Sequence, residues 1–197
     1  LFTSKNVLHV FPHWNWQPGQ QVDVWAYYNN ADEVELYLNG QSLGKKSKTS
    51  DELHVQWRVS YEQGILKAVS RKNGKQVLEK EIHTAGSSYS IRLTPDRSRL
   101  SANGEDLSFI TVEIVDKKGN VVPDAANLVK FTLKGPASIA GVDNGSHTSM
   151  ESFQASQRSA FKGKCLVVIR TGNQKGAITV TASADGLLSS AVSLQVQ

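Results

Sequence analysis

Short runs of alternating apolar and polar residues, each followed by a turn signal, constrain the fold of this chain most. Residues 34–38 read Val-Glu-Leu-Tyr-Leu and are followed at once by Asn39-Gly40. Successive side chains of a strand point to opposite faces, so the valine and two leucines share one face while the glutamate and tyrosine share the other. Asn-Gly tolerates positive φ and predicts a tight hairpin turn. The pattern indicates half-buried antiparallel sheet.

The same pattern recurs along the chain, and no stretch carries an apolar stripe at helical spacing for more than two turns. The further strand candidates are residues 21–27, 55–59, 65–69, 76–79, 90–94, 109–115, 129–133, 165–169, 178–182 and 191–196. About seven short strands in about 110 residues of the second half are typical of a β-sandwich. We therefore expect an all-β protein.

Composition changes sharply near residues 84–88. All four Trp and four of the five Tyr lie before this point, while Val, Ile, Leu, Ala, Ser and Thr dominate after it. Two separate cores explain such a shift. The sequence therefore predicts two tandem immunoglobulin-like β-sandwich domains, residues 1–86 and 87–197, joined by the small polar residues 85–88.

Charge and cysteine content exclude several classes of protein. The net charge is +4, and the basic run at residues 45–48, Lys-Lys-Ser-Lys, lacks interleaved Arg and aromatic residues, so it predicts a solvated loop and no nucleic-acid partner. No apolar stretch is long enough for membrane insertion. The chain starts at Leu1, so we expect any export signal on a longer precursor. The single Cys165 lies in a β-rich run and predicts a buried structural thiol.

The most specific motif is residues 8–16, Leu-His-Val-Phe-Pro-His-Trp-Asn-Trp. Together with residues 34–44, it resembles the segment that follows the catalytic barrel in bacterial glycoside hydrolase family 2 enzymes, the β-galactosidase type with extra C-terminal immunoglobulin-like domains. Residues 100–106 and 115–123 resemble invasin/intimin-type bacterial immunoglobulin-like domains. The two resemblances in tandem cover nearly the whole chain.

The resemblance implies that the chemistry is carried out elsewhere. In that family a sugar-binding jelly roll, an immunoglobulin-like domain and a TIM barrel precede these modules, and two barrel glutamates act as acid/base and nucleophile. These glutamates have no counterparts in this sequence, so the resemblance implies a parent glycoside hydrolase, no catalytic residues here, no cofactor and an upstream catalytic domain as partner. It also implies a periplasmic, cell-surface or secreted location.

Independent catalysis by this chain is disfavoured by its residues. Retaining glycoside hydrolysis needs two carboxyl groups about 5 Å apart across the scissile bond. The same-face pairs Glu33/Glu35 and Glu79/Glu81 lie on predicted strands, and we interpret them as solvated strand edges.

No metal or triad spacing stands out either. His9 and His13 are four residues apart, but Pro12 argues against a helix that would bring them together. Residues 143–145, Asp-Asn-Gly, lack the spaced carboxylates of a calcium loop and favour a tight turn. Ser146-His147 follows without a nucleophile elbow.

The remaining candidates for substrate binding are His13, Trp14, Asn15 and Trp16. If the motif is extended, both indoles project to one side, where they can stack on a pyranose while His13 or Asn15 hydrogen-bonds its hydroxyls. The alternative is that the indoles pack on their own core or on the barrel, with Trp25 and Trp57 as internal core residues. We expect one indole of the motif to be conspicuously exposed.

The leading hypothesis is a non-catalytic C-terminal accessory region of a family 2 glycoside hydrolase, which buttresses the catalytic barrel and shapes the rim of the sugar pocket. A stand-alone carbohydrate-binding or adhesin-like module is the alternative, and a plain immunoglobulin-type spacer is a third.

Overall fold

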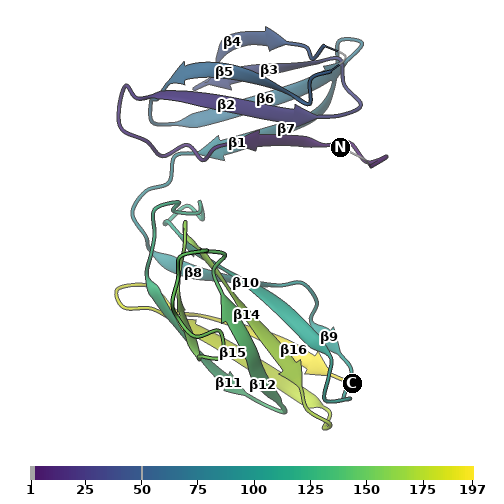
Figure 1. Ribbon diagram of the computed structural model, residues 1–197, viewed down its shortest axis with the longest axis vertical. Coiled ribbons are helices and arrows are strands. Elements are labelled where there is room, and N and C mark those ends of the chain that lie inside the picture. Colours follow the sequence, from purple (N-terminus) through teal and green to yellow (C-terminus); the bar gives the residue numbers. More distant parts are fainter. Residues whose placement is uncertain (1–2, 50) are drawn as a thin grey trace. The chain divides into compact units, whose positions relative to one another are not determined.

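The chain is all-β, as its alternating pattern predicts. A computed structural model describes residues 3–49 and 51–197, and every regular element among them is a strand (Figure 1). The chain divides into two compact units, Leu1–Thr84 and Ala85–Gln197. This division falls two residues before the expected boundary.

The first unit is a sandwich of two antiparallel sheets. One sheet has the order β1-β2-β5 and the other β4-β3-β6-β7. The strands are β1 (Leu8–Phe11), β2 (Gln21–Tyr28), β3 (Glu33–Leu38), β4 (Gln41–Lys46), β5 (His54–Ser60), β6 (Ile65–Lys72) and β7 (Lys75–His83).

The alternation of inward and outward side chains along the strands places the hydrophobic core of the first unit between its two sheets. Val34, Leu36 and Leu38 of β3 are buried, as their spacing predicts. Asn39 and Gly40 have φ values of 51° and 84°, which confirms the tight turn into β4. β4 includes the first two lysines of the basic run, so the expectation of a loop there is wrong for these two: Lys45 lies opposite Glu35 in the register with β3.

The second unit is a larger sandwich with the sheet orders β12-β14-β10-β8 and β13-β11-β15-β16-β9. Its strands are β8 (Ser90–Pro95), β9 (Arg99–Leu100), β10 (Leu107–Val115), β11 (Leu128–Lys134), β12 (Ala137–Asp143), β13 (Gln157–Ser159), β14 (Lys164–Thr171), β15 (Gly176–Ser183) and β16 (Ser190–Val196). Ile110, Val112 and Ile114 alternate inward from β10 and are fully buried.

No strand runs through the joint between the units. β7 ends at His83 and β8 begins at Ser90. The hydroxyl of Thr84 accepts a hydrogen bond from the Gly64 N–H at 3.1 Å within the first unit. The Gly86 N–H donates to a carboxylate oxygen of Asp116 at 2.9 Å within the second. Across the described residues, no helix has the length and apolar character needed to span a membrane.

Candidate functional site

The motif at residues 12–16 leaves the sheet where β1 ends, so its side chains do not follow strand alternation. Trp14 turns inward and is fully buried. Its indole N–H donates to the Glu62 carbonyl at 2.9 Å, and its ring meets Tyr61 edge to face with centroids 5.3 Å apart. Buried indoles are stabilised by such a polar partner. Trp14 is therefore core, and it offers no surface to a sugar.

Trp16 lies at the surface of the same unit but is only partly exposed, since it packs against the core. Its indole N–H donates to the His13 carbonyl at 2.8 Å, and the His13 ring stacks on it with centroids 4.5 Å apart. The Asn15 N–H donates to His13 Nδ1 at 3.3 Å. The expectation of a conspicuously exposed indole is wrong, because the core and His13 cover most of Trp16.

A larger group of rings lies on the outer face of the β1-β2-β5 sheet. Val10, Val24 and Val55 are buried, so the neighbouring positions on these strands point outward. Five of the outward positions on these three strands carry ring side chains, which we name the aromatic face: His9, Phe11, Trp25, Tyr27 and His54. Asp23 and Gln56 are polar positions on the same side of the sheet. The register places His9 and His54 opposite Tyr27, and Phe11 opposite Trp25.

The rings of the aromatic face pack on one another. Trp25 and His54 stack with centroids 4.6 Å apart and planes 7° from parallel. Phe11 and Tyr27 stack at 5.7 Å with planes 14° from parallel. Each ring therefore covers part of its neighbour, which fixes the side chains in one arrangement.

Trp25 corrects an expectation from the sequence, since it is partly exposed and belongs to this face rather than to the core. Along β2 the buried positions are Val22, Val24, Ala26 and Tyr28, out of phase with Trp25. Trp57, by contrast, is buried as expected, with 4% of its surface exposed.

The carboxylates of the predicted strands serve structural contacts. A hydrogen bond from Tyr37 is the main factor that lowers the pKa of Glu35, which pairs with Arg71 at 2.7 Å. Burial raises the pKa of Glu113, but hydrogen bonds and charge from partners such as Lys164, at 2.8 Å, lower it overall. A glycosidase general acid needs the opposite, a raised pKa.

Asp116 has the carboxyl pKa that its hydrogen bonds lower most. Burial raises its pKa, but hydrogen bonds from the N–H groups of Gly86, Lys118 and Asn120 and from the Asn120 side chain outweigh burial and lower the pKa to about 2. The residue fastens the start of the second unit to the turn after β10.

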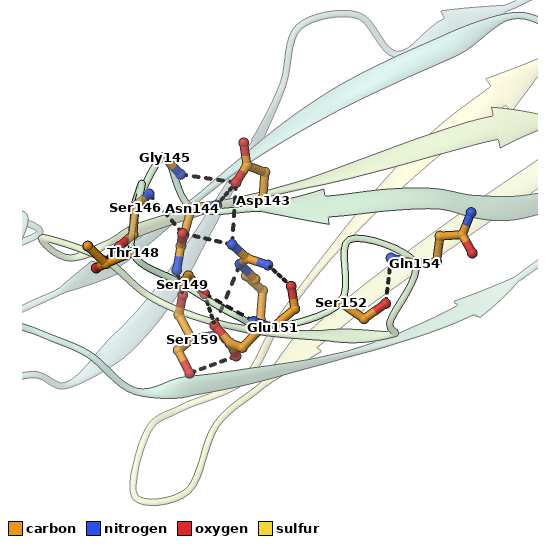
Figure 2. Close-up of polar contacts among 11 residues, drawn as sticks. Asp143, Asn144, Gly145, Ser146, Thr148, Ser149, Glu151, Ser152, Gln154 and Ser159 are labelled. Carbon is orange, nitrogen blue, oxygen red and sulfur yellow. Dashed lines mark hydrogen bonds and ion pairs between the residues drawn. The ribbon is translucent and has the colours of Figure 1, made fainter.

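Sequence reasoning missed a buried cation, Arg158, which lies on the short strand β13 and has none of its surface exposed. Its partners Asp143, Asn144 and Glu151, labelled in Figure 2, come from the end of β12 and the loop between β12 and β13. The two terminal nitrogens donate to the Glu151 carbonyl at 2.9 Å and to Asn144 Oδ1 at 3.0 Å. Carboxylates of Asp143 and Glu151 lie 3.5 and 3.6 Å from the guanidinium.

This network accounts for the Asp-Asn-Gly sequence at residues 143–145. Asp143 Oδ1 accepts the N–H groups of Asn144 and Gly145 at 2.7 and 3.2 Å, so the chain turns locally around that carboxylate. The Asp143 carboxylate also lies beside the guanidinium of Arg158, and a neighbouring positive charge disfavours the binding of Ca²⁺. Across residues 3–49 and 51–197, no group of three or more His, Cys, Asp or Glu side chains is placed to hold a metal ion.

Cys165 is 4% exposed on β14, so the expectation of a buried thiol is confirmed. Burial raises its pKa to about 12. Such a thiol stays protonated at neutral pH and is a poor nucleophile.

Each of the two units matches a known domain family. Residues 91–193 match the family described as glycoside hydrolase family 2 C-terminal domain 5, and residues 19–78 match a domain family of unknown function. The β-galactosidase BoGH2A of Bacteroides ovatus is 58% identical over 186 residues, which are 94% of this chain and 22% of that protein. A β-glucuronidase of Formosa agariphila is 26% identical over 199 aligned positions, and the alignment covers 99% of this chain and 20% of that protein.

A solved structure agrees with both sequence relatives. The crystal structure of a β-glycosidase from Bacteroides vulgatus has a TM-score of 0.93 and 32% identity, and the similarity covers 99% of this chain and 25% of that one. The chain thus spans about a fifth of the length of the curated relatives that it matches. The chain belongs to the family 2 glycoside hydrolases, as the C-terminal region of a β-galactosidase- or β-glucuronidase-like protein.

Proposed function

We propose that this chain is a non-catalytic accessory region that buttresses the catalytic barrel of a β-galactosidase-like family 2 glycoside hydrolase. The observation that carries the proposal is that three partly buried glutamates are committed to internal contacts. Glu35, Glu113 and Glu151 all have lowered pKa values, each through hydrogen bonds or ion pairs within its own unit. A pair of acids poised for glycoside cleavage has one member with a raised pKa.

The first test separates catalysis from support. The purified chain is incubated with an aryl β-galactoside and an aryl β-glucuronide, and we expect no release of the aryl group. Turnover that follows the protein through successive purification steps contradicts the proposal. Binding of β-linked oligosaccharides by the chain alone, without its parent, favours the carbohydrate-binding alternative instead.

The second test measures support directly. Deleting residues 1–197 from the full-length parent is expected to lower its melting temperature and its kcat/KM, since the barrel loses a packed neighbour. Deleting only 85–197 is the matched comparison, because it keeps the unit that carries the motif. A parent whose stability and activity survive removal of both units contradicts the buttress role.

A rim role for the motif is part of the same proposal. Trp16, with His13 stacked on it and Asn15 beside it, forms the surface part of the motif, while buried Trp14 positions them. In the parent, Trp16→Ala is expected to lower the melting temperature modestly through lost packing and, if the indole contacts sugar, to raise KM as well. Phe109→Ala, at a 42% exposed ring of the second unit, is the control. An unchanged KM excludes the rim role.

A further inference from the structure

We propose that the aromatic face of the β1-β2-β5 sheet is the surface by which this chain docks onto the preceding, catalytic part of its own polypeptide. The proposal rests on the proposed function and names the contact that it requires. The outer face of an antiparallel sheet is normally polar. Here the outward positions of three neighbouring strands carry rings at His9, Phe11, Trp25, Tyr27 and His54.

The packing of these rings favours a protein over a sugar as the occupant. A pyranose stacks on an open ring face. In the aromatic face, Trp25 and His54 cover one another, as do Phe11 and Tyr27. The rings therefore form a fixed, mostly apolar surface with part of each ring still exposed, and such a surface fits the centre of a protein interface.

The surroundings of the face match a protein interface as well. The next position outward along β2 is Asp23, which pairs with Arg58 of β5 at 3.5 Å, and both side chains are substantially exposed. Gln21 and Gln56, on the same strands, are exposed too. An aromatic centre bordered by exposed polar and charged groups is the usual anatomy of an interface.

The path of the chain into β1 indicates which part of the polypeptide covers the aromatic face. Residues 3–7 lead directly into β1, the strand that contributes His9 and Phe11 to the face. The Asn29 side-chain amide donates to the carbonyls of Thr3 and Lys5 at 3.2 and 3.0 Å and its oxygen accepts the Val7 N–H at 2.7 Å. The segment that leads in from any preceding residues is thus fastened beside the aromatic face.

Covalent continuity then favours contact between the face and whatever precedes it, because tethering raises the effective concentration of the two surfaces. The curated relatives are several times longer than this chain, which covers 22% and 20% of two of them. The exposed parts of the rings are mostly apolar, so we expect the complementary surface to be apolar at its centre as well.

Hydroxyl-radical footprinting of the full-length parent tests the assignment without a variant that has to fold. The oxidation rates of Phe11, Trp25 and Tyr27 are compared with that of Phe109, an exposed ring of the second unit. Docking excludes water from the face, so we expect the oxidation rates of these three rings, taken relative to that of Phe109, to be at least about fivefold lower in the parent than in the isolated chain. Equal relative rates in the parent and in the isolated chain overturn the proposal.

Two further conditions separate the other occupants. Protection that disappears on dilution of the parent assigns the face to a second copy, and protection that requires added saccharide assigns it to sugar; either result overturns the proposal. The double variant Trp25→Ser/Tyr27→Thr in the parent should make the junction with the barrel more sensitive to protease by at least about tenfold, while Phe109→Thr should not. If the face is unprotected while deletion of residues 1–197 still weakens the parent, this proposal fails and the buttress role stands.

Discussion

The aromatic face and the Arg158 network both depart from the usual placement of side chains, but in opposite ways. The first exposes aromatic rings, and the second buries a charged group. The first unit leaves rings such as Trp25 partly exposed on a sheet surface, whereas the second unit buries a whole guanidinium. Apolar groups gain by leaving water, and charged groups lose unless they are paired. The exposed rings therefore indicate a contact with something else, while the buried cation, surrounded by Glu151, Asn144 and Asp143, serves the unit that contains it.

The largest expected effect is the loss of stability of the second unit when the buried cation Arg158 is removed. Arg158→Ala should destabilise the second unit by about 3–5 kcal/mol, because it leaves a cavity at a fully buried position and removes the donor to the Glu151 carbonyl and to Asn144 Oδ1. All four Trp lie in the first unit, so Trp fluorescence reports on that unit alone during urea unfolding, and hydrogen exchange of β14 reports on the second. Arg97→Ala, which removes a half-exposed cation from its pair with Asp106, is the control and should change stability by about 1 kcal/mol or less. Similar losses in the two variants contradict the role given to Arg158.

Within the first unit, Trp14→Phe should reduce stability by about 2–3 kcal/mol. The change removes ring volume from the core and leaves the Glu62 carbonyl without its donor. Urea unfolding followed by the remaining Trp fluorescence measures this loss. A neutral result shows that the motif is not part of the core.

Acid should act on the second unit through Asp116. Its pKa in the folded chain is about 2, below the ordinary value of 3.8, so its contribution is fully present above about pH 4 and is lost as the pH falls through 2. Asp116→Asn should therefore lower stability by about 2 kcal/mol at pH 7 and by little at pH 2. Unfolding of the second unit measured across this range checks the prediction, and a penalty that does not change with pH contradicts it.

The smallest effect is expected on the aromatic face of the chain by itself. Trp25→Ser should reduce the stability of the first unit by less than about 1 kcal/mol, since only cross-strand ring contacts are lost. Thermal unfolding of the chain measured by circular dichroism tests this, with Trp14→Phe as the reference for a core loss. A loss as large as that of Trp14→Phe assigns the face to internal stability and removes the need for a partner.

Strand positions and the two-unit organisation could be predicted because alternation and turn residues are local signals. The hairpin at Asn39-Gly40 is such a case. Trp25 is a case in which alternation was not applied strictly enough, because the expectation of a core indole follows from its apolar character although it lies in phase with the polar Gln21 and Asp23 along β2. Alternation in this strand indicates the inward face, and residue type by itself does not.

The side-chain contacts of the candidate site were harder to foresee. Trp14 and Trp16 separate because the chain leaves the sheet after Phe11, and nothing in the spacing indicates that departure beyond Pro12. Arg158 was missed because its partners Asp143 and Glu151 come from a loop whose closure depends on the tertiary fold. An inward-facing Arg between two carboxylate-bearing segments is the signal that was present in the sequence.

The inertness of Cys165 has a practical consequence. The chain contains a single cysteine, it is 4% exposed, and its thiol stays protonated well above neutral pH. A maleimide dye or spin probe directed to a pair of cysteines introduced at exposed positions, such as Ser47→Cys in the first unit and Met150→Cys in the second, will therefore react there alone in the folded protein. Distances between the two units can thus be measured spectroscopically on the otherwise native sequence, without first replacing the natural thiol.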